Sequence, residues 1–174
     1  RDGAILMTFQ GAPHNELQLP GGGIDPGESP LRALHREVFE ETGWHIARPR
    51  RLGAFRRFTY MPEYDRFAEK LCHVYVAHPV RRISLPTEPN HTALWIDPEN
   101  ALDLMANAGD AAFLADYLAG MQRAGALVAR QRPPNLAPFA ENQYRAGSSN
   151  IDKKAAPMTA PKKVVLAYSG GLDT

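Results

Sequence analysis

The 174-residue sequence predicts an α/β fold, because short strand-like runs are interspersed with amphipathic helical segments. Residues 71–77 (LCHVYVA) are rich in β-branched and aromatic side chains, which are typical of a central strand. Residues 110–130 carry apolar side chains along one helical face. The hydrophobic content of 44% is sufficient for a packed core. We therefore expect one ordinary domain followed by a tail.

The composition gives no reason to expect a nucleic-acid or membrane partner, because the formal net charge is only +1. No apolar run approaches the roughly 20 residues that a membrane-spanning helix needs. The first residues, RDGAILM, do not have the architecture of a signal peptide. Cys72 is the one cysteine, so an internal disulfide is not possible. It lies in an apolar run, which favours a buried thiol. We expect a cytoplasmic protein.

The first predicted elements are short strands separated by turns. Residues 4–9 form an apolar run suited to a buried strand, and residues 1–3 (RDG) are typical of a hairpin turn. Because a hairpin turn needs a strand on each side, we expect that a natural N-terminal strand is missing. Residues 16–19 alternate polar and apolar side chains as a half-buried strand does. The three glycines at 21–23 predict a flexible loop that can approach a ligand closely.

A helix is predicted between Ser29 and Gly43. Ser29 is a favourable N-cap, and proline at position 30 suits the first helical position. Gly43 is a natural C-terminal cap. We expect an apolar stripe of this helix to dock on the core while its acidic face points outward; the stripe consists of Leu31, Leu34 and Val38.

Three glutamates share one face of this helix. Glu37, Glu40 and Glu41 stand at relative positions i, i+3 and i+4, which are neighbours on a helix surface. A like-charged i,i+4 pair costs about 0.2–0.5 kcal/mol, and a divalent cation would remove that cost. Hard cations such as Mg²⁺ bind oxygen atoms of carboxylates and of substrate phosphates. The spacing therefore predicts a site for metal-assisted phosphate chemistry.

The second half of the predicted domain contains a basic segment, aromatic residues and two helices. Residues 48–57 include five arginines, which form either a phosphate-attracting rim or the solvated outer face of a strand. Phe55, Phe58 and Tyr60 either stack on a base or belong to the core. A turn at 61–66, a loop at 84–90 and a strand at 91–96 are followed by helices at 97–108 and 110–130. The apolar stripe of the last helix is Phe113, Leu114, Tyr117, Leu118 and Met121.

The stretch from Gly22 to Trp44 resembles the Nudix box, G-x5-E-x7-R-E-U-x-E-E-x-G-U, in which U is a bulky apolar residue. Gly22 is followed by Glu28 after five residues, and by the run REVFEETGW at 36–44 after seven more. Every fixed position of the pattern is met. The resemblance extends loosely over residues 1–131 and implies an α/β/α sandwich around a mixed sheet.

Resemblance to Nudix hydrolases implies cleavage of a phosphoanhydride bond in a nucleoside diphosphate linked to another moiety. Water would attack one phosphorus, and two or more Mg²⁺ (or Mn²⁺) ions would offset charge on the pyrophosphate and activate that water. The resemblance implies a small nucleotide substrate but does not identify it. The oligomeric state also stays open, and a homodimer is one option. The implied metal ligands are the carboxylates of Glu37, Glu40 and Glu41 and the carbonyl of Gly22.

The same resemblance implies further roles. Arg36 would orient Glu37 by a charge-assisted hydrogen bond, and Glu28 would hold the loop to the helix. Nudix proteins often use another glutamate outside the box; Glu88 is the candidate by position, and an ordinary loop carboxylate is the alternative. His91 is a weaker candidate nearby. The general base is left open among Glu37, Glu41 and Glu88.

The composition changes at residue 132. Residues 132–163 hold five of the fifteen prolines and four of the five lysines, which predicts a linker. Residues 158–174 resemble the start of argininosuccinate synthase, with a truncated first strand and a S-G-G-x-D-[ST] pyrophosphate-binding loop at 164–174. Backbone N–H groups of such a loop bind phosphate. The implied phosphate-binding residues are Ser169, Gly170, Gly171, Asp173 and Thr174.

Two alternatives to a Nudix hydrolase therefore stay open. In one, the chain is the N-terminal piece of a fused or misread argininosuccinate synthase, an ATP-dependent ligase of citrulline and aspartate. In the other, it is a Nudix-like module that binds a nucleotide without catalysis. The complete box favours the hydrolase.

Overall fold

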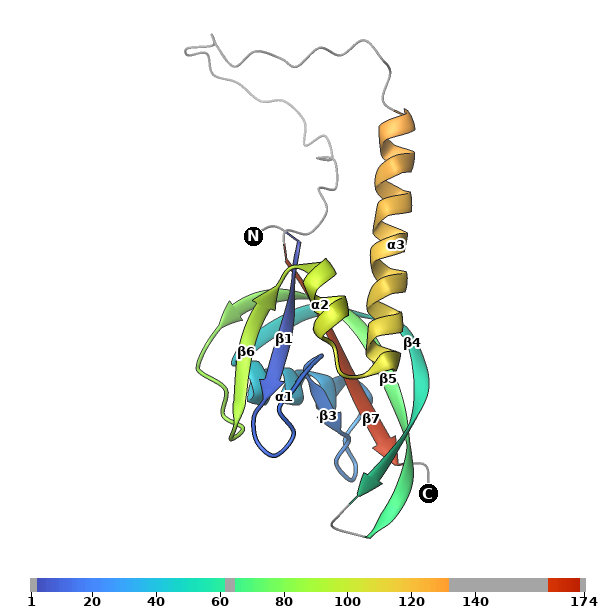
Figure 1. Cartoon of the computed structure of the whole chain (residues 1–174). Helices are drawn as coiled ribbons and strands as arrows, with labels where there is room; N and C mark the ends of the chain where they lie inside the picture. Colours follow the sequence, from blue (N-terminus) through green and yellow to red (C-terminus); the bar gives the residue numbers. More distant parts are fainter. Residues whose placement is uncertain (1–2, 62–64, 132–162, 173–174) are drawn as a thin grey trace.

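The computed structural model describes residues 3–61, 65–131 and 163–172. Its strands form a curved mixed sheet with helices on both faces (Figure 1). The strands are β1 (Ala4–Gln10), β2 (Glu16–Gln18), β3 (Gly21–Gly23), β4 (Trp44–Met61), β5 (Arg66–Arg82), β6 (His91–Ile96) and β7 (Lys163–Leu172). The helices are α1 (Pro30–Thr42), α2 (Pro98–Leu104) and α3 (Ala108–Gln131).

The strand order β2-β1-β7-β5-β4 places β7 in the middle of the sheet. β7 runs parallel to β1 and β3 and antiparallel to β5, while β6 pairs with β1. The sheet is therefore mixed, as the resemblance implied. The predicted central strand at 71–77 is confirmed, because it lies within β5 between β4 and β7.

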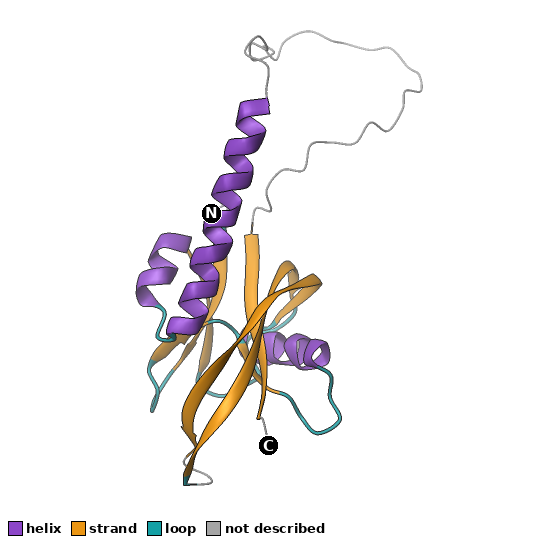
Figure 2. Cartoon of the chain, turned by 90° about the vertical axis from the view of Figure 1, so that its right-hand side faces the viewer, coloured by secondary structure: helices purple, strands orange, loops and turns teal. Residues whose placement is uncertain are grey.

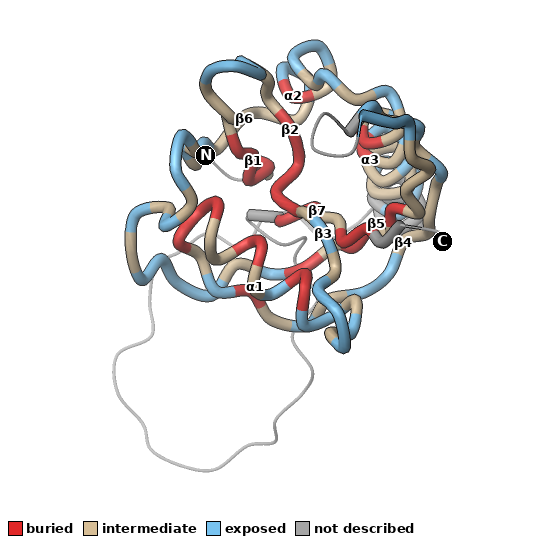
Figure 3. The backbone as a smooth tube through the Cα atoms, turned by 90° about the horizontal axis from the view of Figure 1, so that it is seen from below, coloured by how far each residue is buried: buried red, intermediate tan, exposed pale blue. Residues whose placement is uncertain are grey.

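Two apolar cores lie on opposite faces of the sheet, which confirms the α/β/α arrangement. Ile5 of β1 and Leu166 of β7 pack on the side of α2 and α3, around Leu114. Their chain neighbours Leu6 and Val165 pack on the side of α1. This alternation follows from the two-residue period of a strand. Strands buried on both faces need continuous apolar sequence, and Figure 3 shows how the buried positions gather on the central strands and on the inner side of α1.

The strand that we expect to be missing would precede residue 1, and that expectation stays a prediction. A central position of the sheet is occupied by β7. The prediction of a phosphate-binding loop from Ser169 onward differs from the structure, because Ser169 and Gly170 continue the strand. Ser169 pairs with Gly22 of β3 and with His73 of β5. Backbone groups of β3 and β5 thereby gain hydrogen-bonded partners, which favours an extended backbone here. Residues 132–162 of the predicted linker, and Asp173 and Thr174, lie outside the described residues.

The glycines at 21–23 form strand β3, where the sequence predicted a flexible loop. A Cβ atom at Gly21 would collide with the carbonyl of Tyr168, and one at Gly22 would collide with the carboxylate of Glu37. Glycine is therefore required for close packing between β7 and α1. The sequence predicted that these glycines allow a close approach of the backbone, and here that approach occurs within a sheet.

The predicted ends of α1 are confirmed. Ser29 Oγ accepts a hydrogen bond from the Arg32 N–H at 3.4 Å, and Gly43 adopts a φ of 72° and donates its N–H to the Phe39 carbonyl. The predicted orientation of the helix is only partly right. Leu34 and Val38 are fully buried, but Leu31 is 47% exposed.

The acidic face of α1 does not point to bulk solvent, which corrects the prediction. Glu37 is 7% exposed and Glu41 is 4% exposed. The reason is tertiary: β3 passes along this face, and the Gly21 N–H bonds to Glu41. The carboxylates of Glu37 and Glu41 are therefore covered by β3.

The two C-terminal helices are close to the predicted ranges. α2 ends at Leu104, earlier than predicted, and α3 begins at Ala108. The side chain of Asn107 accepts hydrogen bonds from the N–H groups of Gly109 and Asp110, so it caps α3. Figure 2 shows α3 continuing well beyond the end of the sheet. None of the described helices is long and apolar enough to cross a membrane.

Candidate functional site

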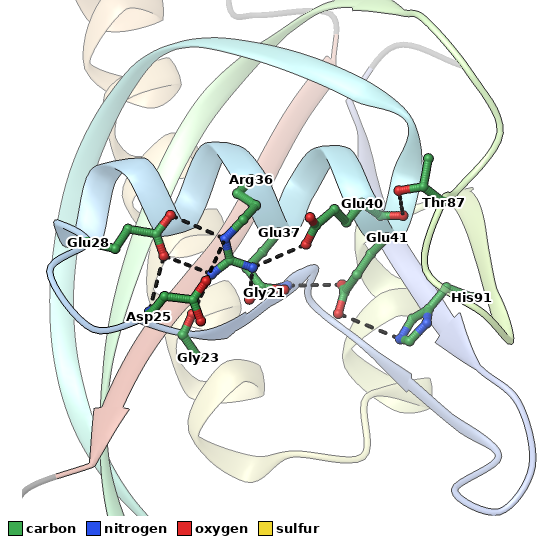
Figure 4. Close-up of polar contacts among 10 residues, drawn as sticks. All are labelled: Gly21, Gly23, Asp25, Glu28, Arg36, Glu37, Glu40, Glu41, Thr87 and His91. Atoms are coloured by element: carbon green, nitrogen blue, oxygen red, sulfur yellow. Dashed lines mark hydrogen bonds and ion pairs between the residues drawn. The ribbon is translucent and has the colours of Figure 1, made fainter.

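Five side chains from three segments converge beside α1. Figure 4 shows three glutamates along one side of the helix, with a histidine facing the last of them. Glu37, Glu40 and Glu88 form one group, in which one oxygen from each lies within 4.8 Å of the others. Glu41, Glu88 and His91 form a second group by the same criterion. Glu88 belongs to both groups, so they are adjacent.

Arg36 ties the loop before α1 to the glutamates of the helix. Its Nη1 donates to Glu37 Oε1 at 2.7 Å and to Glu40 Oε2 at 3.1 Å. Its Nε and Nη2 donate to the two oxygens of Glu28 at 3.2 and 2.8 Å, and Nη2 also reaches the Gly23 carbonyl. These carboxylates, Glu28 first, raise the pKa of Arg36 above its ordinary value. Arg36 thus contacts both Glu37 and Glu28, and the roles that the resemblance implied for these residues stay predictions.

Glu88 is held against α1 by its own backbone. The N–H groups of Thr87 and Glu88 both donate to the Glu40 carbonyl, at 2.7 and 3.0 Å. That carbonyl lies in the last turn of α1, where carbonyls lack partners within the helix. The sequence could suggest Glu88 only from its place in the chain, and this contact explains why the loop lies at the glutamates.

Glu41 has an unusual electrostatic environment. Burial raises its pKa to about 9, against the effect of the hydrogen bond from the Gly21 N–H, and the charges of Glu88 and Glu37 raise it further. Burial also raises the pKa of Glu37, although Arg36 opposes it. A divalent cation among these oxygens would favour their ionised forms. The residues present therefore fit a metal ion with carboxylate ligands.

Glu37, Glu41 and Glu88 line a cleft of about 360 Å³ that also contains cationic side chains. Arg57 of β4 and Lys70 of β5 line it together with Tyr60 and Tyr168. The basic segment at 48–57 thus divides between its two interpretations: Arg57 faces the cleft, whereas Arg56 pairs with Glu69 on the exposed surface.

The aromatic residues of β4 also divide between the two interpretations. Phe55 packs on Phe113 with ring centroids 5.9 Å apart, so it belongs to the core. Tyr60 is exposed and lines the cleft. Phe58 is exposed as well and does not line that cleft.

The residues assigned from the tail do not join the glutamate groups. Ser169 and Gly170 are paired within β7. The same tail contributes Tyr168 to the cleft, which sequence reasoning missed. No local signal could have revealed Tyr168, because its position depends on β7 pairing with strands that are distant in sequence.

Comparison with known proteins agrees with this geometry. The family model described as the NUDIX domain matches residues 1–117, which is more than half of the chain. The chain therefore belongs to the NUDIX family.

Curated relatives match over a short segment. A protein named putative 8-oxo-dGTP diphosphatase from Bacillus subtilis (strain 168) is 43% identical over 49 residues, covering 28% of this chain and 33% of that relative. A protein named RNA pyrophosphohydrolase from Psychrobacter cryohalolentis is 56% identical over 50 residues, covering 25% of this chain and 29% of the relative. An RNA pyrophosphohydrolase from Proteus mirabilis is 49% identical over 43 residues, covering 25% of this chain. The chain thus spans at most about a third of the length of these relatives.

Proposed function

We propose that this chain hydrolyses a phosphoanhydride bond in a nucleoside diphosphate linked to another moiety, with Mg²⁺ or Mn²⁺ bound at the glutamates of α1. The observation that carries the proposal is the convergence of Glu37, Glu40 and Glu41 with Glu88. Glu37, Glu41 and Glu88 line a cleft that cationic side chains also line. Carboxylates bind the cations that accompany pyrophosphate, and lysine and arginine bind phosphate oxygens.

The proposed metal ligands are Glu37, Glu40 and Glu41, with the Gly22 carbonyl and Glu88 as further oxygen donors. When bound, the ions would neutralise charge on the pyrophosphate and lower the pKa of the attacking water. Arg36 keeps Glu37 and Glu40 in position through its two hydrogen bonds from Nη1.

The other cleft residues would position the substrate. Arg57 and Lys70 would bind phosphate oxygens that the metal leaves free. Tyr60, on the β4–β5 hairpin, offers an aromatic surface for the base or for the second moiety. We assign this hairpin to substrate recognition and α1 to the reaction.

The proposal is tested by the variant Glu41→Gln, with Glu99→Gln on the exposed start of α2 as the matched control. We expect Glu41→Gln to lower turnover by about a hundredfold or more, as loss of an essential catalytic group does, and Glu99→Gln to leave it unchanged. The assay is phosphate release with Mg²⁺ or Mn²⁺. Full turnover by Glu41→Gln would contradict the proposal.

The substrate panel needs to be broad. It includes nucleoside triphosphates, ADP-ribose, dinucleotides and dinucleoside polyphosphates. It also includes 8-oxo-dGTP and 5′-triphosphorylated RNA, because relatives carry those names. Turnover of the RNA would contradict our prediction that no nucleic acid is a partner. Binding of a nucleotide without turnover would favour the non-catalytic module.

The variant Glu88→Gln separates two roles for this glutamate. If Glu88 is the general base, turnover falls while the affinity for Mn²⁺ stays the same. If it is a metal ligand, the affinity for Mn²⁺ falls as well. Isothermal titration with Mn²⁺, beside the turnover assay, distinguishes the two outcomes.

A further inference from the structure

His91 has a defined orientation and an unused nitrogen. Its side chain is only 2% exposed, and its Nδ1 lies 2.9 Å from the Pro89 carbonyl oxygen. A carbonyl oxygen can only accept a hydrogen bond, so Nδ1 carries the proton. In the tautomer with its proton on Nδ1, the ring presents a lone pair at Nε2.

The Nε2 atom of His91 faces a carboxylate oxygen that also lacks a close donor. Nε2 lies 3.6 Å from Glu41 Oε1, which is too long for a hydrogen bond. The other oxygen of Glu41 already accepts the Gly21 N–H at 3.0 Å. One carboxylate oxygen of Glu88 lies within 4.8 Å of a ring nitrogen of His91 and of a carboxylate oxygen of Glu41. Three electron-pair donors thus converge on one point from a strand, a helix and a loop.

The surrounding structure holds these donors rigidly. His91 opens β6 and pairs with Gln10 of β1, while the Pro89 carbonyl fixes the plane of its ring. A backbone carbonyl that accepts the second N–H is the usual way in which proteins orient a metal-binding imidazole. Glu88 is held by its backbone bond to the Glu40 carbonyl.

We propose that Glu41, Glu88 and His91 form a second cation site, which contains a nitrogen ligand and shares Glu88 with the site at Glu37 and Glu40. The inference rests on the proposed function only in taking the glutamates as metal ligands. Imidazole binds Mn²⁺ and later transition ions more readily than it binds Mg²⁺, which prefers oxygen. The second site therefore selects a transition ion, whereas the all-oxygen site accepts Mg²⁺.

The experiment is pulsed electron paramagnetic resonance of Mn²⁺ bound to the full chain, because coupling to ¹⁴N reports an imidazole ligand directly. We compare the unaltered chain with His91→Ala and His91→Gln. The matched control is His14→Ala, a histidine that lines the same cleft but belongs to neither group. Thermal melts confirm that each variant is folded.

We expect ¹⁴N coupling in the unaltered chain and in His14→Ala, and none in either His91 variant. We also expect His91→Ala to weaken one class of Mn²⁺ binding by about tenfold or more. His91→Gln, which supplies an oxygen, is expected to retain more Mn²⁺ affinity than His91→Ala and to lose the preference for Mn²⁺ over Mg²⁺. If His91→Ala is unstable, His91→Gln alone still tests whether the ¹⁴N coupling comes from His91.

Bound Mn²⁺ without ¹⁴N coupling, or coupling that survives in both His91 variants, would overturn the inference and leave the proposed hydrolase intact. In that case His91 contacts Glu41 without binding a metal ion. Absence of any Mn²⁺ binding would overturn the inference together with the metal part of the proposed function. Loss of turnover in Glu41→Gln, together with ¹⁴N coupling in the unaltered chain, would support both the inference and the proposed function.

Discussion

At the scale of single residues, Arg36 has the most demanding position beside the glutamates of α1. It bonds at once to Glu28, Glu37, Glu40 and the Gly23 carbonyl. The planar fork of arginine can serve several oxygens in fixed directions, and the ammonium of lysine cannot. The arrangement of the carboxylates therefore depends on the shape of this side chain as well as on its charge.

We predict that Arg36→Lys lowers the free energy of unfolding by about 1–3 kcal/mol, because it leaves the buried carboxylate of Glu37 without its donor. Turnover is expected to fall with it. The control is Arg32→Lys, on the exposed side of the same helix. Urea unfolding measures the stability, and equal midpoints for the two variants would show that the fork is dispensable.

Asp110 is a second residue with an electrostatic consequence. It is 1% exposed, and neither of its carboxylate oxygens has a hydrogen-bond partner among the described residues. Burial raises its pKa from 3.8 to about 7, although Arg57 opposes the shift. Between these two values the unfolded chain releases the proton and the folded chain keeps it. The free energy of unfolding therefore falls as the pH rises from about 4 to about 7. Above that range the destabilisation due to Asp110 stays constant.

We predict that Asp110→Asn removes this loss. Its gain in melting temperature over the unaltered chain should be small near pH 4, grow up to about pH 7, and then stay level. Calorimetry at three pH values across the window measures the gain. A gain that does not change with pH would show that Asp110 ionises normally in the folded chain.

At the scale of elements, β3 explains why α1 can bury its glutamates. The strand has no side chains, so it fits between Tyr168 of β7 and the carboxylate of Glu37. It also places the Gly21 N–H on Glu41. The glycine strand is thus both a spacer and a hydrogen-bond donor.

We predict that Gly21→Ala destabilises the fold by about 1–3 kcal/mol, the usual cost of forcing a methyl group into a packed site. The control is Gly120→Ala in α3, where an added Cβ meets no atom within 4 Å. That change should stabilise the helix by about 0.5–1 kcal/mol. Denaturant midpoints for the two variants should therefore move in opposite directions, and a shared direction would contradict the role of β3.

At the scale of the whole molecule, β7 connects the two halves of the sheet. It pairs with β1, β3 and β5 and contributes Val165 and Leu166 to opposite cores. β7 is therefore a structural part of the same sheet as the strands that carry the site.

We predict that a chain ending at residue 131 loses cooperative unfolding, because β1, β3 and β5 would each lack a hydrogen-bonded neighbour and both cores would be open. A synthetic peptide of residues 162–174, added in excess, should restore the transition. A single-residue comparison is Leu166→Ala, which should cost about 2–5 kcal/mol. Circular dichroism melts measure all three, and an unchanged melt of the shortened chain would show that β7 is not required.

Local features of this protein were predictable from the sequence. The caps of α1 at Ser29 and Gly43 depend on residues within a few positions of each helix end, and the spacing of Glu37, Glu40 and Glu41 depends only on helix geometry. The limits of β6 at 91–96 follow from a short alternating run bounded by turn residues. Such features are determined by neighbours along the chain.

Long-range features were decided only by the tertiary structure. The sequence marked residues 164–168 as a strand but contained no information about its partners, because any strand offers the same backbone groups to any neighbour. The contact between His91 and Glu41 joins positions fifty residues apart, and the burial of the α1 glutamates depends on where β3 passes. The sequence by itself determined the helix, its caps and the carboxylates it carries. The packing of β3, β6 and β7 around that helix decided which of those carboxylates are buried, and which side chains they meet.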